Sequence, residues 1–257
     1  MENDVQVWAD HPGWVRAHQG LKIYFWGLIA YVAFAVLITI LAAGSAVGTL
    51  AARTEGSGDD IAAAVEAFIV WARVGAVGFL AIQAVLIEGL RRYAQLPKTT
   101  NGRTLAVAAF WLSGAALALA LYRAVDVLFL TDTAALVAQA KAGGVDVEGL
   151  VNTLLNLGML VCFIRSMQLT AEAVGEVDHA ARARLALVLA GVVAILQIGS
   201  TVLAATSTDP HGIGAVAGLL GIAFLGIGIW MLVNYLMVIY GLSQSIARHV
   251  DLSRSFD

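Results

Sequence analysis

Long apolar runs alternate with short polar segments along the whole chain, and this pattern decides the fold class. Each run has at least about 20 residues, the helical length that crosses a bilayer core of about 30 Å. The six predicted spans cover residues 21–51, 61–90, 104–130, 150–170, 185–206 and 213–244. Ala, Leu and Gly dominate the runs, and the two-residue alternation of barrel strands is missing. The sequence therefore predicts an all-α integral membrane protein, a bundle of six transmembrane helices.

Short polar turns indicate how these spans pair. Residues 56–60, Gly-Ser-Gly-Asp-Asp, separate the first span from the second, and residues 207–212 with Asp209-Pro210 separate the fifth from the sixth. Turns this short force neighbouring helices to run antiparallel. A longer polar segment, residues 131–148, separates the third span from the fourth. We therefore expect three antiparallel hairpins.

The spans define one domain with a short segment at each end. The transmembrane domain is predicted to cover residues 21–246. Residues 1–20 contain Trp8 and Trp14 among charged residues, a mixture typical of a segment that lies at the membrane interface. Residues 247–257 are expected to form a short cytoplasmic tail.

Cationic residues are distributed unequally over the loops, and this predicts the orientation. Ten lie on one side of the six spans and only two on the other. The ten are Arg16, Lys22, Arg91, Arg92, Lys98, Arg103, Arg182, Arg184, Arg248 and Arg254, and the two are Arg53 and Lys141. Loops rich in Lys and Arg stay in the cytoplasm. Both termini and the second and fourth loops are therefore predicted to be cytoplasmic, in the inner (cytoplasmic) membrane.

Composition agrees with a lipid environment. Hydrophobic residues make up 60% of the chain and charged residues 13%, against roughly one half and one quarter in a soluble domain. The lipid bilayer is therefore the main predicted partner, with further copies of the chain or other membrane subunits beside it. The net charge of −3 and the scattered Lys and Arg residues argue against nucleic acid.

Charged residues are rare inside the spans, and four of them fall at a similar depth on the second and third. The four are Glu66, Arg73, Arg123 and Asp126. Arg73 lies 17 residues, or about 26 Å, from the predicted cytoplasmic end of its span. Charges at membrane depth usually pair or mark a function. We expect a buried cluster in the outer leaflet with Asp126 paired to Arg73. The cluster would be either a set of structural salt bridges or the polar mouth of a pore.

Two further charges, Glu88 and Arg165, lie toward the predicted cytoplasmic ends of the second and fourth spans. Long side chains at such positions reach the aqueous interface by snorkelling. A structural role is the favoured interpretation for both.

Neutral polar residues inside the spans suggest a polar path. Asn152 and Asn156 share a helix face at i and i+4, and Gln197 and Asn234 lie in the fifth and sixth spans. Hydrogen bonding between helices is the simpler interpretation, and a path for a solute is the alternative.

Small residues at four-residue spacing predict places where helices pack closely, because such strips let backbones approach in lipid. They occur in the first and sixth spans. The residues are Gly44, Gly48, Gly214, Ala217, Gly218 and Gly221.

Three classes of function are compatible with these features. The favoured class is a channel or transporter that uses the buried charges, and the alternative is a non-catalytic structural or accessory subunit of a larger membrane complex. A membrane enzyme is disfavoured because the chain has no HExxH, no GxSxG and no P-loop motif. All five histidines lie outside the predicted spans, so we expect no cofactor and no metal.

Overall fold

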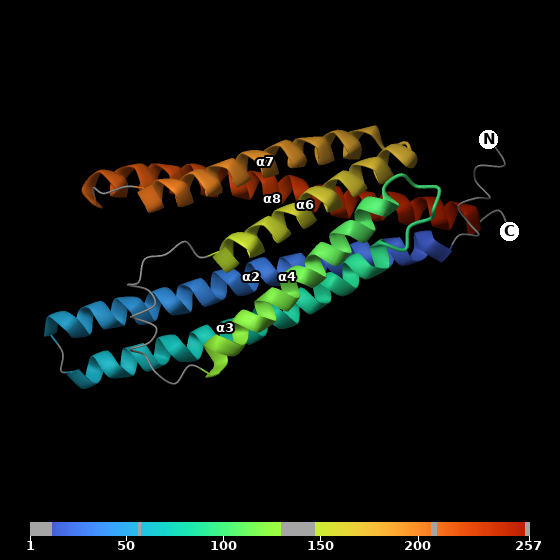
Figure 1. The fold of residues 1–257 in the computed structure, drawn as a ribbon. Helices are drawn as coiled ribbons and strands as arrows, with labels where there is room; N and C mark the ends of the chain where they lie inside the picture. Colours follow the sequence, from blue (N-terminus) through green and yellow to red (C-terminus); the bar gives the residue numbers. More distant parts are fainter. Residues whose placement is uncertain (1–11, 56–57, 130–146, 207–209, 255–257) are drawn as a thin grey trace.

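The computed structural model describes residues 12–55, 58–129, 147–206 and 210–254, and these residues form six long helices and the connections 94–102 and 174–176 (Figure 1). The helices are α2 (Pro12–Glu55), α3 (Gly58–Tyr93), α4 (Arg103–Phe129), α6 (Val147–Ala173), α7 (Val177–Thr206) and α8 (Pro210–Arg254). Within these ranges, all six are long and apolar enough to cross a membrane. The prediction of an all-helical, six-span chain is confirmed at this level.

The first helix begins earlier than the predicted span. It starts at Pro12, a residue suited to the first helical position because its missing N–H would have no partner there. Residues 12–20 are therefore part of α2, and Trp14 is buried in the core. The remaining part of the expected interfacial segment, residues 1–11, lies outside the described residues.

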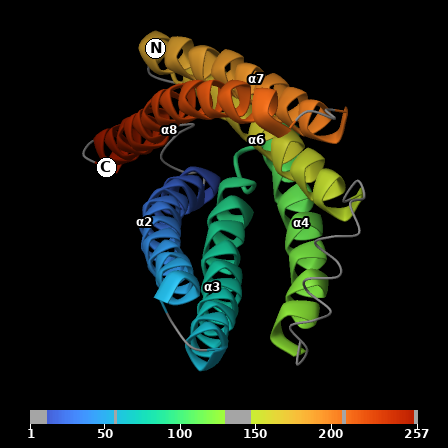
Figure 2. The same ribbon diagram turned by 90° about the vertical axis from the view of Figure 1, so that its left-hand side faces the viewer.

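The six helices form a ring. The most extensive contacts are those of α2 with α3, α4 with α6 and α7 with α8, the three pairs that the predicted hairpins contain. Contacts of α3 with α4, α6 with α7 and α8 with α2 close the ring, which Figure 2 shows nearly along its axis. The start of α2, the end of α8 and the connections 94–102 and 174–176 lie at one end of the bundle (Figure 1). This is named the basic end, because Arg92, Lys98 and Arg184 lie there.

The core of the protein is concentrated at the basic end. Leu21, Leu90, Phe163 and Ile239, from four different helices, are completely buried there. Toward the opposite end the α2–α3 pair and the α7–α8 pair diverge (Figure 1). The helices are thus tied together on one side of the bundle and separate on the other.

Two glycines hold α2 and α3 together at the basic end. A Cβ atom on Gly20 would lie 2.5 Å from the Tyr93 backbone nitrogen and 2.6 Å from the Gly89 carbonyl oxygen. A Cβ atom on Gly89 would in turn lie 2.9 Å from the Tyr24 backbone nitrogen. Because no real Cβ fits at these distances, only glycine allows this approach of the two backbones.

Candidate functional site

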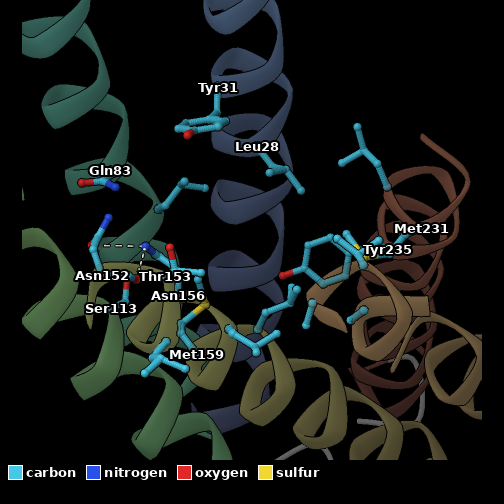
Figure 3. Close-up of a pocket in the computed structure, with 18 of the residues that line it drawn as sticks. Leu28, Tyr31, Gln83, Ser113, Asn152, Thr153, Asn156, Met159, Met231 and Tyr235 are labelled. Carbon is cyan, nitrogen blue, oxygen red and sulfur yellow. Dashed lines mark hydrogen bonds between the residues drawn. The ribbon is translucent and has the colours of Figure 1, made fainter. Parts of the chain in front are cut away.

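A cavity of about 480 Å³ lies at the centre of the ring, next to the core (Figure 3). All six helices contribute to its lining. Six of the lining residues carry amide or hydroxyl groups on side chains that are only half-buried. They are Tyr31, Gln83, Ser113, Asn152, Thr153 and Asn156. A cavity of this volume falls in the range of small-molecule sites, about 300–1,000 Å³.

The two asparagines of α6 lie in this cavity, on one helix face as predicted. The Asn156 amide Nδ2 donates to the Asn152 carbonyl oxygen at 2.9 Å and to the Asn152 Oδ1 at 3.3 Å. Thr153 donates its hydroxyl to the Gly149 carbonyl oxygen at 2.9 Å. Hydrogen bonds within α6 therefore orient the polar wall of the cavity, and they leave the Asn152 amide nitrogen facing it.

Gln83 of α3 lies beside Asn152 on the same side of the cavity (Figure 3). Its Oε1 atom is buried and accepts no hydrogen bond from the residues that the structure describes. A buried amide oxygen without a donor is costly, and native structures contain few of them. Sequence analysis missed Gln83, because it stands alone among apolar residues with no polar partner one turn away. Its isolation in a long apolar run was the one signal that could have pointed to it.

Aromatic rings close the cavity on the side of the basic end. Tyr24 of α2 and Tyr235 of α8 line it, and the Tyr235 hydroxyl donates to the Tyr24 hydroxyl at 3.1 Å. Behind them lies Phe163 of α6, with ring centroids 4.7 Å from Tyr24 and 5.3 Å from Tyr93 of α3. All four rings are buried. They are named the aromatic floor, and the cavity ends at this floor.

Hydrogen bonds below the aromatic floor fasten the helices to one another. The Tyr93 hydroxyl lies 3.0 Å from the Thr170 hydroxyl, and Ser166 donates to the Gly102 carbonyl oxygen at 2.7 Å. The Nδ1 atom of His18 on α2 lies within hydrogen-bond distance, 2.8 Å, of the Ser243 carbonyl oxygen on α8. These buried groups have partners, in contrast to Gln83 in the cavity.

The predicted charge cluster is absent from the part of the chain that the structure describes. Arg123 pairs with Glu148 of α6 at 3.7 Å, and their side chains are 39% and 53% exposed. Arg73 is half-buried. The side chains of Glu66 and Asp126 lie outside the described residues, and so does the expected pair of Asp126 with Arg73. Among the described residues the cluster is therefore not formed, because depth along two helices does not determine which side chains face each other; the pair of Asp126 with Arg73 stays a prediction.

The two inner-end charges lie at the basic end and have local partners. Glu88 accepts hydrogen bonds from Arg91 at 2.6 Å and Arg92 at 2.7 Å, both on its own helix. Arg165 donates to Gln168 at 2.6 Å, one turn further along α6. Both arrangements agree with the structural role favoured for these residues.

Of the other two residues of the expected polar path, one can be placed and it does not extend the path. The side chain of Gln197 lies outside the described residues. Asn234 donates to the Trp230 carbonyl oxygen of its own helix at 2.9 Å and does not line the cavity.

Of the residues in the predicted glycine strips, only Gly44 can be described in its surroundings, and a Cβ atom there would meet nothing within 4 Å. The surroundings of Gly48, Gly214, Ala217, Gly218 and Gly221 lie outside the described residues, so those contacts stay predictions. Backbones approach closely at Gly20 and Gly89, which belong to no four-residue small-residue spacing.

The fold and its six apolar helices define a polytopic α-helical membrane protein, with an uncharged central cavity as its candidate site. In comparisons with known proteins, the chain matches no protein-family model, no curated protein and no solved structure.

Proposed function

We propose that this protein is a membrane transport component that binds a solute in the central cavity. The cavity with its polar wall inside the bundle is the observation that carries the proposal. Neutral polar side chains inside a membrane bundle either hydrogen-bond between helices or line a path for a solute, and a cavity beside them favours the path. Transporters commonly bind their substrates near the middle of the bilayer. Gln83 lies 10 residues before the end of its 25-residue span, about 15 Å from the basic end.

In this proposal the site opens on the side away from the basic end. The lining residues of α6 run from Leu150 to Leu160, in the half of the helix that lies away from the basic end. The aromatic floor blocks the other direction. With the basic end in the cytoplasm, as the positive-inside rule predicts, the cavity faces the outside. A site open to one side and closed to the other suits a carrier better than an open channel.

If the protein were an accessory subunit, we would expect an interior in which the buried polar groups are paired. In a purely structural bundle the polar groups would satisfy one another, as Tyr93, Thr170 and Ser166 do below the aromatic floor. The buried Oε1 of Gln83 has no such partner among the described residues. The Nδ1 atom of His179 at the basic end also has no hydrogen-bond partner among the described residues. The position of Gln83 in the wall of a cavity, together with its missing hydrogen bond, is therefore what favours solute binding over a structural role.

Cysteine accessibility tests the proposal. In a Cys162→Ala background, Ser113→Cys places a thiol in the cavity, and Ala109→Cys places one a single turn closer to the basic end on the same helix. Ala109 is completely buried. A membrane-impermeant thiol reagent should label Ser113→Cys from outside intact cells and leave Ala109→Cys unlabelled.

A transport component must also expose its site to the other side. Ser113→Cys should therefore react in inside-out vesicles as well, more slowly than from outside. No reaction from either side would refute a water-filled site. Reaction from outside alone would contradict transport and leave a binding function only.

A further inference from the structure

We propose that the ligand of the central cavity is an uncharged amphipathic molecule, with an apolar body and a head group that donates a hydrogen bond. The inference rests on the proposed function and names the class of its solute. It follows from three properties of the cavity: a polar wall, an opposing apolar wall and the lack of charged lining groups.

The polar wall comes from α3, α4 and α6. Gln83, Ser113 and Asn152 gather on one side of the cavity, with Asn156 beside Asn152 (Figure 3). Gln83 Oε1 is a buried acceptor in need of a donor. The Asn152 amide nitrogen is a donor beside it, because the hydrogen bonds between the two asparagines use only the Asn152 oxygens. A hydroxyl group both donates and accepts, so it satisfies the two amides together.

The more apolar wall comes from α2, α7 and α8. Leu28, Val193 and Met231 line this side, and Figure 3 shows Met231 far from Gln83. The hydroxyls on these helices are those of Tyr24 and Tyr235, which hydrogen-bond to each other, and of Tyr31. Flexible methionine and branched aliphatic side chains suit a hydrocarbon body of variable shape. Because the two walls differ in this way, a ligand must itself have one polar end and one apolar end.

The lining contains no Asp, Glu, Lys, Arg or His residue among those that the structure describes. A charged head group would lose its hydration on entry and gain no opposite charge, which is strongly unfavourable in a low-dielectric site. Neutral amides and hydroxyls instead replace the water around an uncharged head group. The cavity should therefore select against anions and cations with the same hydrocarbon chain.

This proposal is tested by measuring how far a bound probe protects the cavity thiol of Ser113→Cys from the thiol reagent. The protein is held in phosphatidylcholine nanodiscs. Three probes share one chain length and differ in the head group: 1-octanoylglycerol is neutral, octanoate is an anion and octylamine is a cation. We expect 1-octanoylglycerol to slow the reaction of the cavity thiol in a saturable manner. Octanoate and octylamine should protect about tenfold less well, because neither finds a counter-charge.

Gln83→Leu provides the matched variant, with Ala84→Leu as its control. Ala84 is the next residue of α3, is exposed and does not line the cavity. Loss of one hydrogen bond should weaken protection by 1-octanoylglycerol about fivefold in Gln83→Leu, and Ala84→Leu should bind like the parent. The thermal stability of Gln83→Leu without ligand should not fall, since its Oε1 has no partner to lose.

The possible failures are distinguishable. Equal protection by all three probes, or equal weakening by the two leucine variants, would overturn the amphipathic ligand and leave the proposed function intact. A cavity thiol that never reacts would instead refute the proposed function, and this inference with it.

Discussion

The half of the bundle at the basic end and the half that contains the cavity are built from similar residues but packed differently. At the basic end, aromatic and aliphatic side chains from all six helices are buried together, and hydroxyl groups pair across helices. Away from it, a polar wall faces a cavity. Large apolar side chains face outward in both halves, such as Val177 (75% exposed) at the basic end and Ile40 (63% exposed) away from it, so the interior and not the outer surface distinguishes them. Stability is thus concentrated on one side, and the other side is left free to bind.

The largest expected difference between the halves comes from one substitution at two sites on α2. Gly20→Ala should destabilise the bundle by about 3 kcal/mol, because its Cβ would overlap the α3 backbone. Gly44→Ala should not lower the free energy of unfolding, because its Cβ would lie within 4 Å of no other atom and alanine favours a helix. Thermal unfolding in detergent measures both. Similar losses at the two sites would show that the halves are packed alike.

A smaller difference is expected between two tyrosines. Tyr93→Phe removes a buried hydroxyl that lies within hydrogen-bond distance of Thr170 and Ser166, so it should cost about 1 kcal/mol. Tyr31→Phe removes a hydroxyl at the cavity wall and should leave the unfolding temperature unchanged. An unfolding temperature that falls equally in both variants would argue against a distinct, hydrogen-bonded basic end.

The smallest effect is expected for Arg123. Its ion pair with Glu148 is largely exposed, and such pairs contribute about 1 kcal/mol or less. Arg123→Gln should therefore change the free energy of unfolding only slightly. A loss of about 3–5 kcal/mol, the cost of breaking a buried pair, would restore the charge cluster expected from the sequence.

The spans and their pairing could be predicted from the sequence because lipid demands long apolar helices, and short turns force neighbours to be antiparallel. The asparagines of α6 could be assigned to one face, since i and i+4 positions coincide whatever the helix packs against. These properties depend on one helix, or on two joined by a turn.

The remaining features depend on which residues of distant helices meet. Gly20 and Gly89 are 69 residues apart, and neither stands in the four-residue small-residue spacing from which close packing was predicted. Gln83 becomes part of a site only because α6 places two amides beside it. The prediction of the charge cluster went wrong for the same reason. The depth of each charged residue along its helix could be predicted, and the direction in which its side chain faces could not.

A cysteine scan along the inner face of α6 tests the central claim, a cavity closed at the aromatic floor, most directly. In a Cys162→Ala background, single cysteines replace Asn152, Asn156, Leu160, Phe163 and Met167 in turn, and an impermeant thiol reagent is added outside intact cells. We predict reaction at the first three positions, which line the cavity, and none at Phe163 or Met167, which are completely buried. Reaction at all five, or at none, would contradict the account.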